Sequence, residues 1–336
     1  MKEMSEELLT IVNNFPRKKV LVIGDVMLDK YSFGRVKRIS PEAPVPVLLL
    51  EKEEYKAGGA ANVALNVANL SPQSEVHLFG FTGEDFYGEI LKKLLEEKKI
   101  TCHFKTNSLT CVKERVIGWT SGQKQHILRI DKEEISKKIF DDKIQEILDL
   151  AKSADIIIVS DYAKGVITYD LMSYLHPFKH KIFIDPKPSN KDFKAIYKNA
   201  FLITPSRDEA VLMSGYSEVD EAGYFLRKEF DANIMITIGK DGMKLFPTFK
   251  ENKESLDKIY IKTIPEESFE ETGAGDTAIA TLALALSTQK EKSLSLFKNS
   301  AKIANMAAGI TVKHIGSYAP TFIELQEKIS KTTNVQ

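Results

Sequence analysis

Short runs of Ile, Val and Leu alternate along this chain with longer segments in which apolar residues recur at helical spacing. The apolar runs have the length of buried strands and are bounded by turn residues. The predicted strands are Val20–Gly24, Val76–Phe81, Asp155–Ser160, Ile182–Asp185, Phe201–Thr204 and Asn233–Gly239. The predicted helices are Gly59–Leu70, Glu84–Lys99, Asp141–Lys152, Arg207–Ser214, Glu221–Phe230, Gly275–Ser287 and Leu294–Thr311. This alternation predicts an α/β fold with a doubly wound, mainly parallel sheet flanked by helices.

Two stretches do not follow this alternation of strands and helices, and they predict a small separate β-sheet. Residues 31–57 carry several prolines and then a strand-like run, and residues 110–131 alternate apolar and polar positions around a Ser121-Gly122 turn. We interpret both stretches as a lid that covers a site on one domain of residues 1–336. Two ordinary surface hairpins fit the same pattern.

Composition narrows the class of protein. The chain has 47 Lys and Arg against 47 Asp and Glu, so its net charge gives no case for nucleic acid as a partner. Cys102 and Cys111 lack a zinc spacing and are predicted to be free thiols. The N-terminus has the pattern of an acidic amphipathic helix rather than a signal peptide, and no apolar run has the length of a membrane span. We therefore expect a cytoplasmic protein without a membrane partner.

The strongest local motif is T-G-A-G-D-T at residues 272–277, which opens an apolar helix. The small residues Gly273, Ala274 and Gly275 let backbone N–H groups surround an anion at the positive end of that helix. Asp276 stands where it would take the proton of an attacking hydroxyl, an arrangement that suits phosphoryl transfer. We expect the helix end to keep Asp276 ionised and therefore a weak base.

Other interpretations of this motif exist. It matches the dinucleotide fingerprint G-x-G-x-x-A, but no apolar strand precedes it and it lies near the C-terminus. The chain contains no G-x-x-x-x-G-K-[ST] loop. A helix start with small residues and a stabilising acid in the first turn remains an alternative.

Polar groups also follow the first predicted strand. Asp25 comes directly after it and Asp29 shortly later, at an edge where carboxylates commonly bind sugar hydroxyls. A strand-end turn with a capping Asp is the alternative. Gly58 and Gly59 allow close approach of a substrate and Asn62 offers a hydroxyl contact, although a tight turn explains the glycines equally well.

Two further groups lie in the middle of the chain. Asp185 and Lys187 follow a strand and combine a turn with a cation. Thr237, Gly239 and Gly242 follow another strand and suit contacts to phosphate or ribose.

The order of these motifs resembles the ribokinase-like (PfkB) sugar kinases over nearly the whole chain. Within that family the chain is most similar to kinases of D-glycero-β-D-manno-heptose 7-phosphate. This similarity rests on G-D-V-M-L-D-K-Y (24–31), R-I-S-P-E-A-P-V-P-V (38–47), G-G-A-A-N-V-A (58–64), S-D-Y-A-K-G (160–165) and D-P-K (185–187).

The resemblance implies a reaction and its participants. ATP would phosphorylate the anomeric hydroxyl of the heptose 7-phosphate to the 1,7-bisphosphate, in synthesis of lipopolysaccharide core precursors. Mg²⁺ is implied, a requirement for a monovalent cation is left open, and a homodimer built through the lid is expected. Another sugar or nucleoside kinase of this fold, or a non-catalytic nucleotide sensor, are the competing functions.

The resemblance also assigns residues. Candidates for the sugar phosphate are Arg38, Arg129, Lys164 and Lys187, and those for the nucleotide are Ser206, Thr237, Gly239, Gly242, Thr272 and Asn305. Glu209 would place Mg²⁺ through water. The chain departs from the family pattern at Ser206, where Asn is usual, and at Glu270, where Asp is usual. Many relatives carry a nucleotidyltransferase domain after the kinase, and we expect a separate protein to supply that step here.

Overall fold

The computed structural model describes residues 2–15, 17–120, 123–135, 140–248, 250–251, 254–255, 258–263 and 270–332. Within them a nine-stranded sheet has the order β15-β12-β11-β10-β9-β8-β1-β4-β5. Its parallel strands are β1 (Lys19–Gly24), β4 (Glu75–Gly83), β5 (Thr101–Asn107), β8 (Ile156–Ser160), β9 (Ile182–Asp185), β10 (Leu202–Ile203) and β11 (Asn233–Thr237). At one edge β12 (Met243–Phe246) and β15 (Ile259–Ile261) run antiparallel. All the predicted body strands are confirmed, whereas β5, β12 and β15 were missed.

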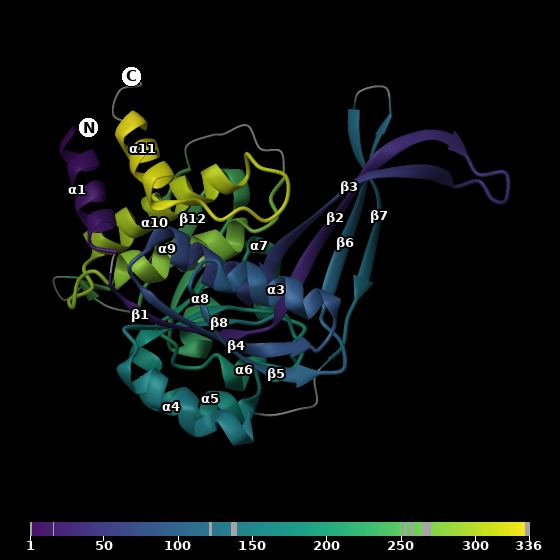
Figure 1. The fold of residues 1–336 in the computed structure, drawn as a ribbon. Helices are drawn as coiled ribbons and strands as arrows, with labels where there is room; N and C mark the ends of the chain where they lie inside the picture. The colour runs from purple at the N-terminus through teal and green to yellow at the C-terminus, as the bar shows by residue number, and fades with distance from the viewer. Residues whose placement is uncertain are drawn as a thin grey trace.

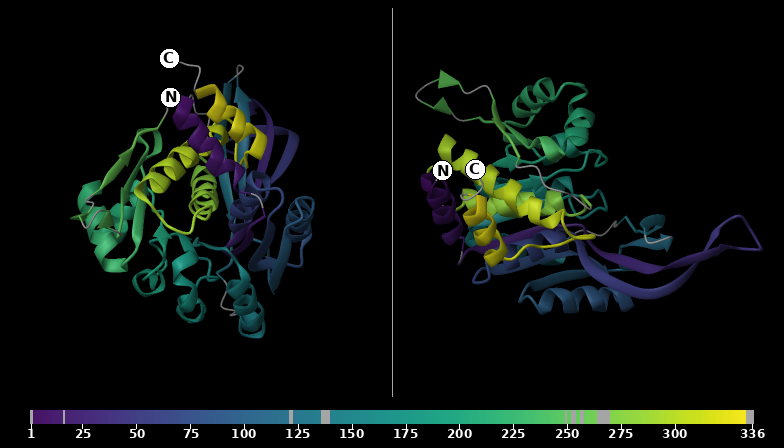
Figure 2. Two further views of the ribbon diagram at one scale, coloured as in Figure 1. Left: turned by 90° about the vertical axis from the view of Figure 1, so that its left-hand side faces the viewer. Right: turned by 90° about the horizontal axis from the view of Figure 1, so that it is seen from above.

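Helices cover both faces of this sheet (Figures 1 and 2). One face carries α1 (Lys2–Asn13), α2 (Ala60–Leu70), α3 (Phe86–Glu96), α9 (Ala274–Leu286), α10 (Leu294–Thr311) and α11 (Phe322–Thr332). The other carries α4 (Ile144–Ser153), α5 (Tyr169–Leu175), α6 (Phe193–Ile196), α7 (Arg207–Ser214) and α8 (Val219–Phe230). Side chains of β1 alternate between the two cores: Val20 and Val22 join one, Leu21 and Ile23 the other. This two-sided burial explains the continuous apolar runs in the sequence.

Short elements complete the body. They are the 3₁₀ turns η1 (Asp141–Lys143), η2 (His176–Lys181) and η3 (Gly239–Asp241) and the antiparallel pair β13 (Lys250–Glu251) and β14 (Glu254–Ser255). No helix in the described ranges is long and apolar enough to cross a membrane.

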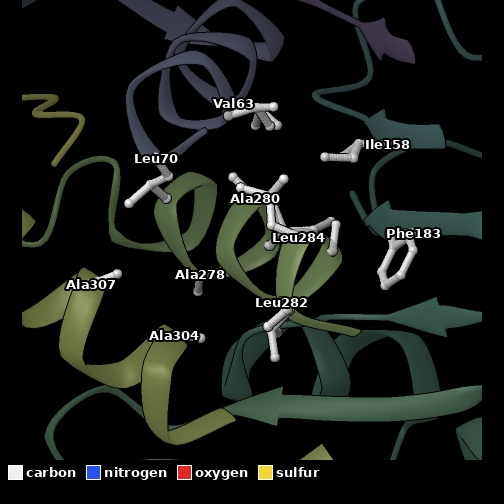
Figure 3. Close-up of a cluster of buried hydrophobic side chains, with 14 of the residues drawn as sticks. Val63, Leu70, Ile158, Phe183, Ala278, Ala280, Leu282, Leu284, Ala304 and Ala307 are labelled. Carbon is white, nitrogen blue, oxygen red and sulfur yellow. The ribbon is translucent and has the colours of Figure 1, made fainter. Parts of the chain in front are cut away.

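Helix α9 lies at the centre of the larger core (Figure 3). Every residue of α9 from Asp276 to Leu286 is buried. Its Ala278 lies near Ala304 and Ala307 of α10, whereas Ala280 lies toward Val63 of α2, and small side chains there let the helices approach closely. Asp276 therefore lies in the first turn of a tightly packed helix.

The lid is a separate four-stranded sheet with the order β3-β2-β6-β7, and it projects from the body (Figure 1). Its strands are β2 (Val26–Ile39), β3 (Pro46–Gly59), β6 (Val112–Thr120) and β7 (Gln123–Lys132). The predicted small sheet is thus confirmed, although it starts at Val26 rather than at Tyr31. The predicted Ser121-Gly122 turn lies outside the described residues.

Candidate active site

The carboxyl ends of the central strands bring acidic residues to one edge of the sheet. Gly24 of β1 pairs with Ser160 of β8, and Ser160 pairs with Asp185 of β9. Asp25 directly follows Gly24. The polar residues Asp25, Ser160 and Asp185 therefore lie side by side at the carboxyl ends of β1, β8 and β9, where a doubly wound sheet is expected to have its crevice.

Asp276 faces this edge from the first turn of α9. Its Oδ2 accepts a hydrogen bond from Asn62 Nδ2 at 2.7 Å, and its Oδ1 accepts one from the Tyr162 hydroxyl at 3.0 Å. Burial and, less strongly, the nearby Asp29 carboxylate raise the pKa of Asp276, the hydrogen bonds from Asn62 and Tyr162 and the charge of Lys113 lower it, and the net pKa is about 6. The expectation of a weak base is therefore wrong, because loss of hydration outweighs the helix end. Asp276 is mainly ionised at pH 7 and is a stronger base than an exposed Asp.

The backbone before Asp276 is tightly packed at Gly273 but leaves room for an anion at Gly275. Gly273 caps α9 with a φ of 81°, and a Cβ there would lie 3.0 Å from Asn62 Nδ2. A Cβ added at Gly275 would meet nothing within 4 Å. The Ala274 N–H is already bonded to the Glu271 carbonyl at 3.2 Å. The first-turn N–H groups of Gly275 and Asp276 lack intrahelical partners and are the better donors for an anion.

Asp25 has a structural task at the same edge. Its carboxylate accepts hydrogen bonds from the backbone N–H groups of Tyr162 (2.7 Å), Lys164 (3.0 Å) and Val166 (3.2 Å). Burial raises the pKa of Asp25 to about 6 despite these bonds, and the nearby Asp161 adds to the rise. Asp25 thereby fixes the loop that carries Tyr162, while its contact with a sugar stays a prediction.

Asp29 lies at the root of the lid and is also buried. Its Oδ1 accepts a hydrogen bond from Arg115 Nη1 at 2.9 Å, and its Oδ2 accepts one from Ser317 Oγ at 2.6 Å. Gly59, at the other root, has a φ of 57° and leads into α2, which positions Asn62. A Cβ on Gly58 would meet Asp29 Oδ2 at 2.9 Å, so the two roots are in close contact.

The cations predicted for a sugar phosphate are mostly paired. Lys164 Nζ lies 2.5 Å from Glu133, Lys187 Nζ lies 3.0 Å from Glu209, and Arg129 binds Asp131 through two bonds of 2.7 and 2.6 Å. Arg38 is exposed near the far end of β2. Successive strand residues advance by about 3.3 Å, so Arg38 lies roughly 30 Å along β2 from Asp29. Within one chain, Arg38 is not part of the cluster around Asp276.

Lys113 on β6 is a cation that the sequence prediction missed. Its Nζ lies 4.9 Å from the centre of the Tyr162 ring, and it forms no ion pair with any residue that the structure describes. Burial lowers its pKa, while the nearby Asp29 carboxylate opposes that shift. Lys113 lies in the predicted lid segment 110–131, and Tyr162 lies in the S-D-Y-A-K-G motif. Only the packing of the lid on the body brings both side chains close to Asp276.

The predicted nucleotide side is built around the N-terminus of α7. Ser206 and Glu209 form a reciprocal capping box: Ser206 Oγ accepts from the Glu209 N–H at 3.3 Å, and Glu209 Oε2 accepts from the Ser206 N–H at 3.0 Å. Thr237 at the end of β11 bridges to Ser206. Ser206, the departure from the family pattern, therefore caps a helix.

Glycines and one amide mark the rest of this side. Gly239 and Gly242 have φ of 52° and 99° in the turn after β11, and a Cβ on Gly239 would find open space apart from Glu271 Oε1 at 4.0 Å. Thr272 Oγ1 donates to Glu270 Oε1 at 2.6 Å. The buried Nδ2 of Asn305 on α10 has no hydrogen-bond partner among the described residues. An orphaned buried donor is what a pocket for a polar base edge would contain.

Comparisons with known proteins identify the family of the chain. Residues 17–323 match the pfkB family of carbohydrate kinases. The chain is similar to the bifunctional protein HldE of Actinobacillus succinogenes, 37% identical over 329 residues that cover 95% of this chain and 65% of the relative. The HldE of Haemophilus influenzae is 36% identical over 325 residues, 94% of this chain and 64% of the relative. The chain thus spans about two thirds of the length of these relatives.

Solved structures share the fold. Ribokinase from Thermotoga maritima superposes with a TM-score of 0.72 at 20% identity, over 93% of this chain and 99% of that structure. Arabidopsis thaliana ribokinase, solved with ribose and ATP, gives 0.69 at 17% identity over the same shares, 93% and 99%. The likeness confirms the ribokinase-like α/β fold. Because residues 17–323 match its model, the chain belongs to the pfkB family of carbohydrate kinases.

Proposed function

We propose that this kinase transfers the γ-phosphoryl group of ATP to the anomeric hydroxyl of D-glycero-β-D-manno-heptose 7-phosphate. The observation that carries the proposal is the buried Asp276 carboxylate directly after the open glycine cradle of α9. The family supports ATP as the donor. The R-I-S-P-E-A-P-V-P-V segment at 38–47 and the similarity to HldE proteins support the heptose phosphate as the acceptor.

Asp276 is the proposed general base. The hydroxyl oxygen forms the new bond to the γ-phosphorus, the bond from that phosphorus to the β–γ bridging oxygen breaks, and the proton of the hydroxyl passes to the Asp276 carboxylate. Asn62 and Tyr162 fix the carboxylate by donating to its two oxygens. The N–H groups of Gly275 and Asp276 would stabilise charge on the transferring oxygens.

Mg²⁺ would be held partly by the protein and mainly by phosphate and water. Asp185 has no hydrogen-bonded side-chain partner in the described part of the chain, and burial together with the Asp276 and Glu209 carboxylates raises its pKa well above the usual range. Such a carboxylate fits a nearby cation, and Glu209 lies on the same side. No group of three or more His, Cys, Asp or Glu among the described residues is arranged to hold a metal, which suits a water-rich Mg²⁺ shell. Bound Mg²⁺ would neutralise the phosphate charge.

Lys113 is the cation that we propose for recognition of the anionic acceptor. It is half-buried, it carries no ion pair with a described residue, and it lies over Tyr162, which bonds Asp276. Lys164 and Lys187 remain candidates if the incoming phosphate displaces Glu133 or Glu209. A charge-assisted contact contributes about 1.5–3 kcal/mol.

Exposed apolar side chains on the lid support a homodimer. Large apolar side chains on its strands are strongly exposed: Leu49 by 56%, Leu50 by 52%, Leu128 by 55% and Ile130 by 47%. Neighbouring strand residues such as Leu49 and Leu50 point to opposite faces, so both faces of the projecting sheet carry apolar side chains of the kind found at interfaces. We propose that a second copy covers them, and that Leu128→Glu converts the dimer to a monomer in light scattering.

An assay of ATP consumption with a panel of sugars tests the proposed function. Heptose 7-phosphate should be turned over with the highest kcat/KM, ahead of hexose phosphates, unphosphorylated sugars and nucleosides. A higher kcat/KM with another sugar or a nucleoside would reassign the acceptor. Absence of ATP turnover with every acceptor would favour a nucleotide sensor instead.

A further inference from the structure

A closed ring of polar contacts joins the lid to the loop before α9. Arg115 of β6 donates to Asp29 of β2 at 2.9 Å, and its Nε lies 3.8 Å from Glu270 Oε1. Glu270 Oε2 accepts from the Gly316 N–H at 2.8 Å, and the neighbouring Ser317 donates to Asp29 at 2.6 Å. The ring therefore passes twice between lid and body.

The members of this ring are largely withdrawn from water. Side-chain exposure is 11% for Arg115, 5% for Asp29 and 17% for Glu270. Ion pairs at this depth are screened little by salt, and removal of one partner leaves an uncompensated charge. Lys56 of β3 adds a second cation, since its Nζ donates to the Ile315 carbonyl. Strands β2, β3 and β6 of the lid thus all contact the body at this point.

The same contacts reach the anion cradle, by which we mean the backbone of residues 273–276 at the start of α9. Glu270 Oε1 accepts from Thr272 Oγ1 at 2.6 Å, directly before Gly273. A Cβ on Gly273 would lie 3.3 Å from the Cα of Ser317, so the 315–317 loop lies against the cradle itself. Gly316, with a φ of 73°, lies so close to the Tyr31 ring of the lid that a Cβ would approach it to 2.4 Å. A shift of the lid must therefore shift the neighbours of the cradle.

From this geometry we infer that Arg115 and Glu270 are positioning residues that couple the seating of the lid to the shape of the anion cradle. The inference rests on the proposed function, in which the lid covers the sugar and the cradle holds the transferring phosphate. It also explains the departure at position 270. Glu is one methylene longer than the usual Asp, and its carboxylate spans Thr272, Gly316 and Arg115 together.

The consequence is that sugar phosphate and nucleotide should bind cooperatively. The lid carries the only tryptophan of the chain, Trp119, which stacks on Phe33 at 6.0 Å. Its fluorescence reports the lid. Coupling between two sites typically changes affinity by about 5- to 150-fold. We expect MgADP to tighten binding of the acceptor sugar phosphate within that range in the wild-type protein.

The test compares Glu270→Gln and Arg115→Met with Glu114→Gln. Glu114 neighbours Arg115 on the same strand and binds Lys30 and Ser32, which lie within the lid. The affinity of the turned-over sugar phosphate is measured by Trp119 fluorescence with and without MgADP. In Glu270→Gln and Arg115→Met the tightening by MgADP should fall below about twofold, whereas Glu114→Gln should keep the wild-type ratio.

Each result decides the matter. A purely structural role would lower the melting temperature and leave the MgADP ratio unchanged in Glu270→Gln, which would overturn the inference, as would a wild-type ratio near one. If Arg115→Met does not fold, Glu270→Gln alone decides.

Failure of the proposed function is distinguishable from failure of this inference. If the panel finds another acceptor, the proposed substrate is wrong, but the same ratio is measured with that acceptor. If no sugar is turned over, MgADP alone should still change Trp119 emission in the wild type and Glu114→Gln, but not in Glu270→Gln.

Discussion

Two helices, α9 and α7, begin at the same edge of the sheet with an acidic residue in the first turn, and their surroundings give those acids different tasks. Asp276 of α9 is buried, and among the described residues its carboxylate receives hydrogen bonds from the neutral donors Asn62 and Tyr162 alone. Glu209 of α7 closes a capping box with Ser206 and pairs with Lys187, whose side chain is 40% exposed. The same helix position thus holds a carboxylate with a raised pKa, the proposed base, where water is excluded, and a cap with an ion pair where water has access.

The largest effect should come from Asp276→Asn. Asn keeps the shape but cannot accept a proton, so we expect kcat to fall by about 10²–10⁴-fold with nearly unchanged binding of ATP and sugar. Replacement of a buried carboxylate whose pKa is raised removes a desolvation cost above pH 6. The melting temperature at pH 8 should therefore equal or exceed that of the wild type.

Kinetics and a thermal melt on this variant separate the base from a mere helix cap. A cap predicts lower stability with near-normal kcat. That outcome would show that Asp276 of α9, like Glu209 of α7, serves as a helix cap and not as a base.

Loss of the distal phosphate from the acceptor should have the next largest effect. We expect kcat/KM to drop by about 10- to 100-fold for the unphosphorylated heptose, because a charge-assisted contact is lost. Lys113→Met should bring the two sugars to similar kcat/KM values. Lys164→Met tests the competing candidate and should keep the preference of the wild type, since Lys164 already pairs with Glu133. Equal turnover of both sugars by the wild type would contradict this recognition.

The pH profile should show a smaller effect that we assign to Asp276, and Tyr162→Phe separates it from Asp25, whose pKa is also raised to about 6 but which Tyr162 bonds only through its backbone N–H. The base acts when ionised, so kcat should fall about tenfold per pH unit below a pKa near 6 and level off above it. The Tyr162 hydrogen bond lowers that pKa, and Tyr162→Phe should therefore move the acid limb to higher pH. Tyr197→Phe removes a similar bond to Asp161 and should leave the limb in place. A limb unmoved in Tyr162→Phe would show that another group titrates.

Ser206→Asn should have the smallest effect. Asn caps helices as well as Ser does, so stability should stay within a few tenths of a kcal/mol. Activity should be equal or higher, because Asn restores the usual family residue. A severe loss of kcat/KM in this variant would show that the α7 end has a role in the reaction that its capping box does not reveal.

The sequence predicted the body of the fold because buried parallel strands have continuous apolar runs. It missed β5, whose residues TCHFKTN are largely polar, since an edge strand needs no such run. It also missed the two antiparallel strands β12 and β15 beyond β11. Their length of four and three residues left little pattern to detect.

The site was predictable where a motif is local and unpredictable where distant segments meet. Asp276 and Asn62 each stand in a recognisable motif, and the structure joins them by a hydrogen bond. Lys113 and Arg115 reach the edge only through the lid, by packing that no sequence spacing encodes. The raised pKa of Asp276 was likewise hidden, because it depends on burial by segments far apart in the chain.

The roots of the lid have a consequence for how this enzyme can diversify. The Ala60 N–H donates to the Asp25 carbonyl at 3.0 Å, and Val26 pairs with Gly59, so the chain leaves the body and returns to it at nearly one point. A longer, shorter or exchanged excursion between these points leaves the register of β1 with β4 and β8 intact. Connecting segments of this kind accept changes in length at little free-energy cost. Under the proposed function, in which Lys113 of the lid recognises the acceptor, acceptor specificity can therefore evolve in the lid while the proposed phosphoryl-transfer residues in the body stay constant.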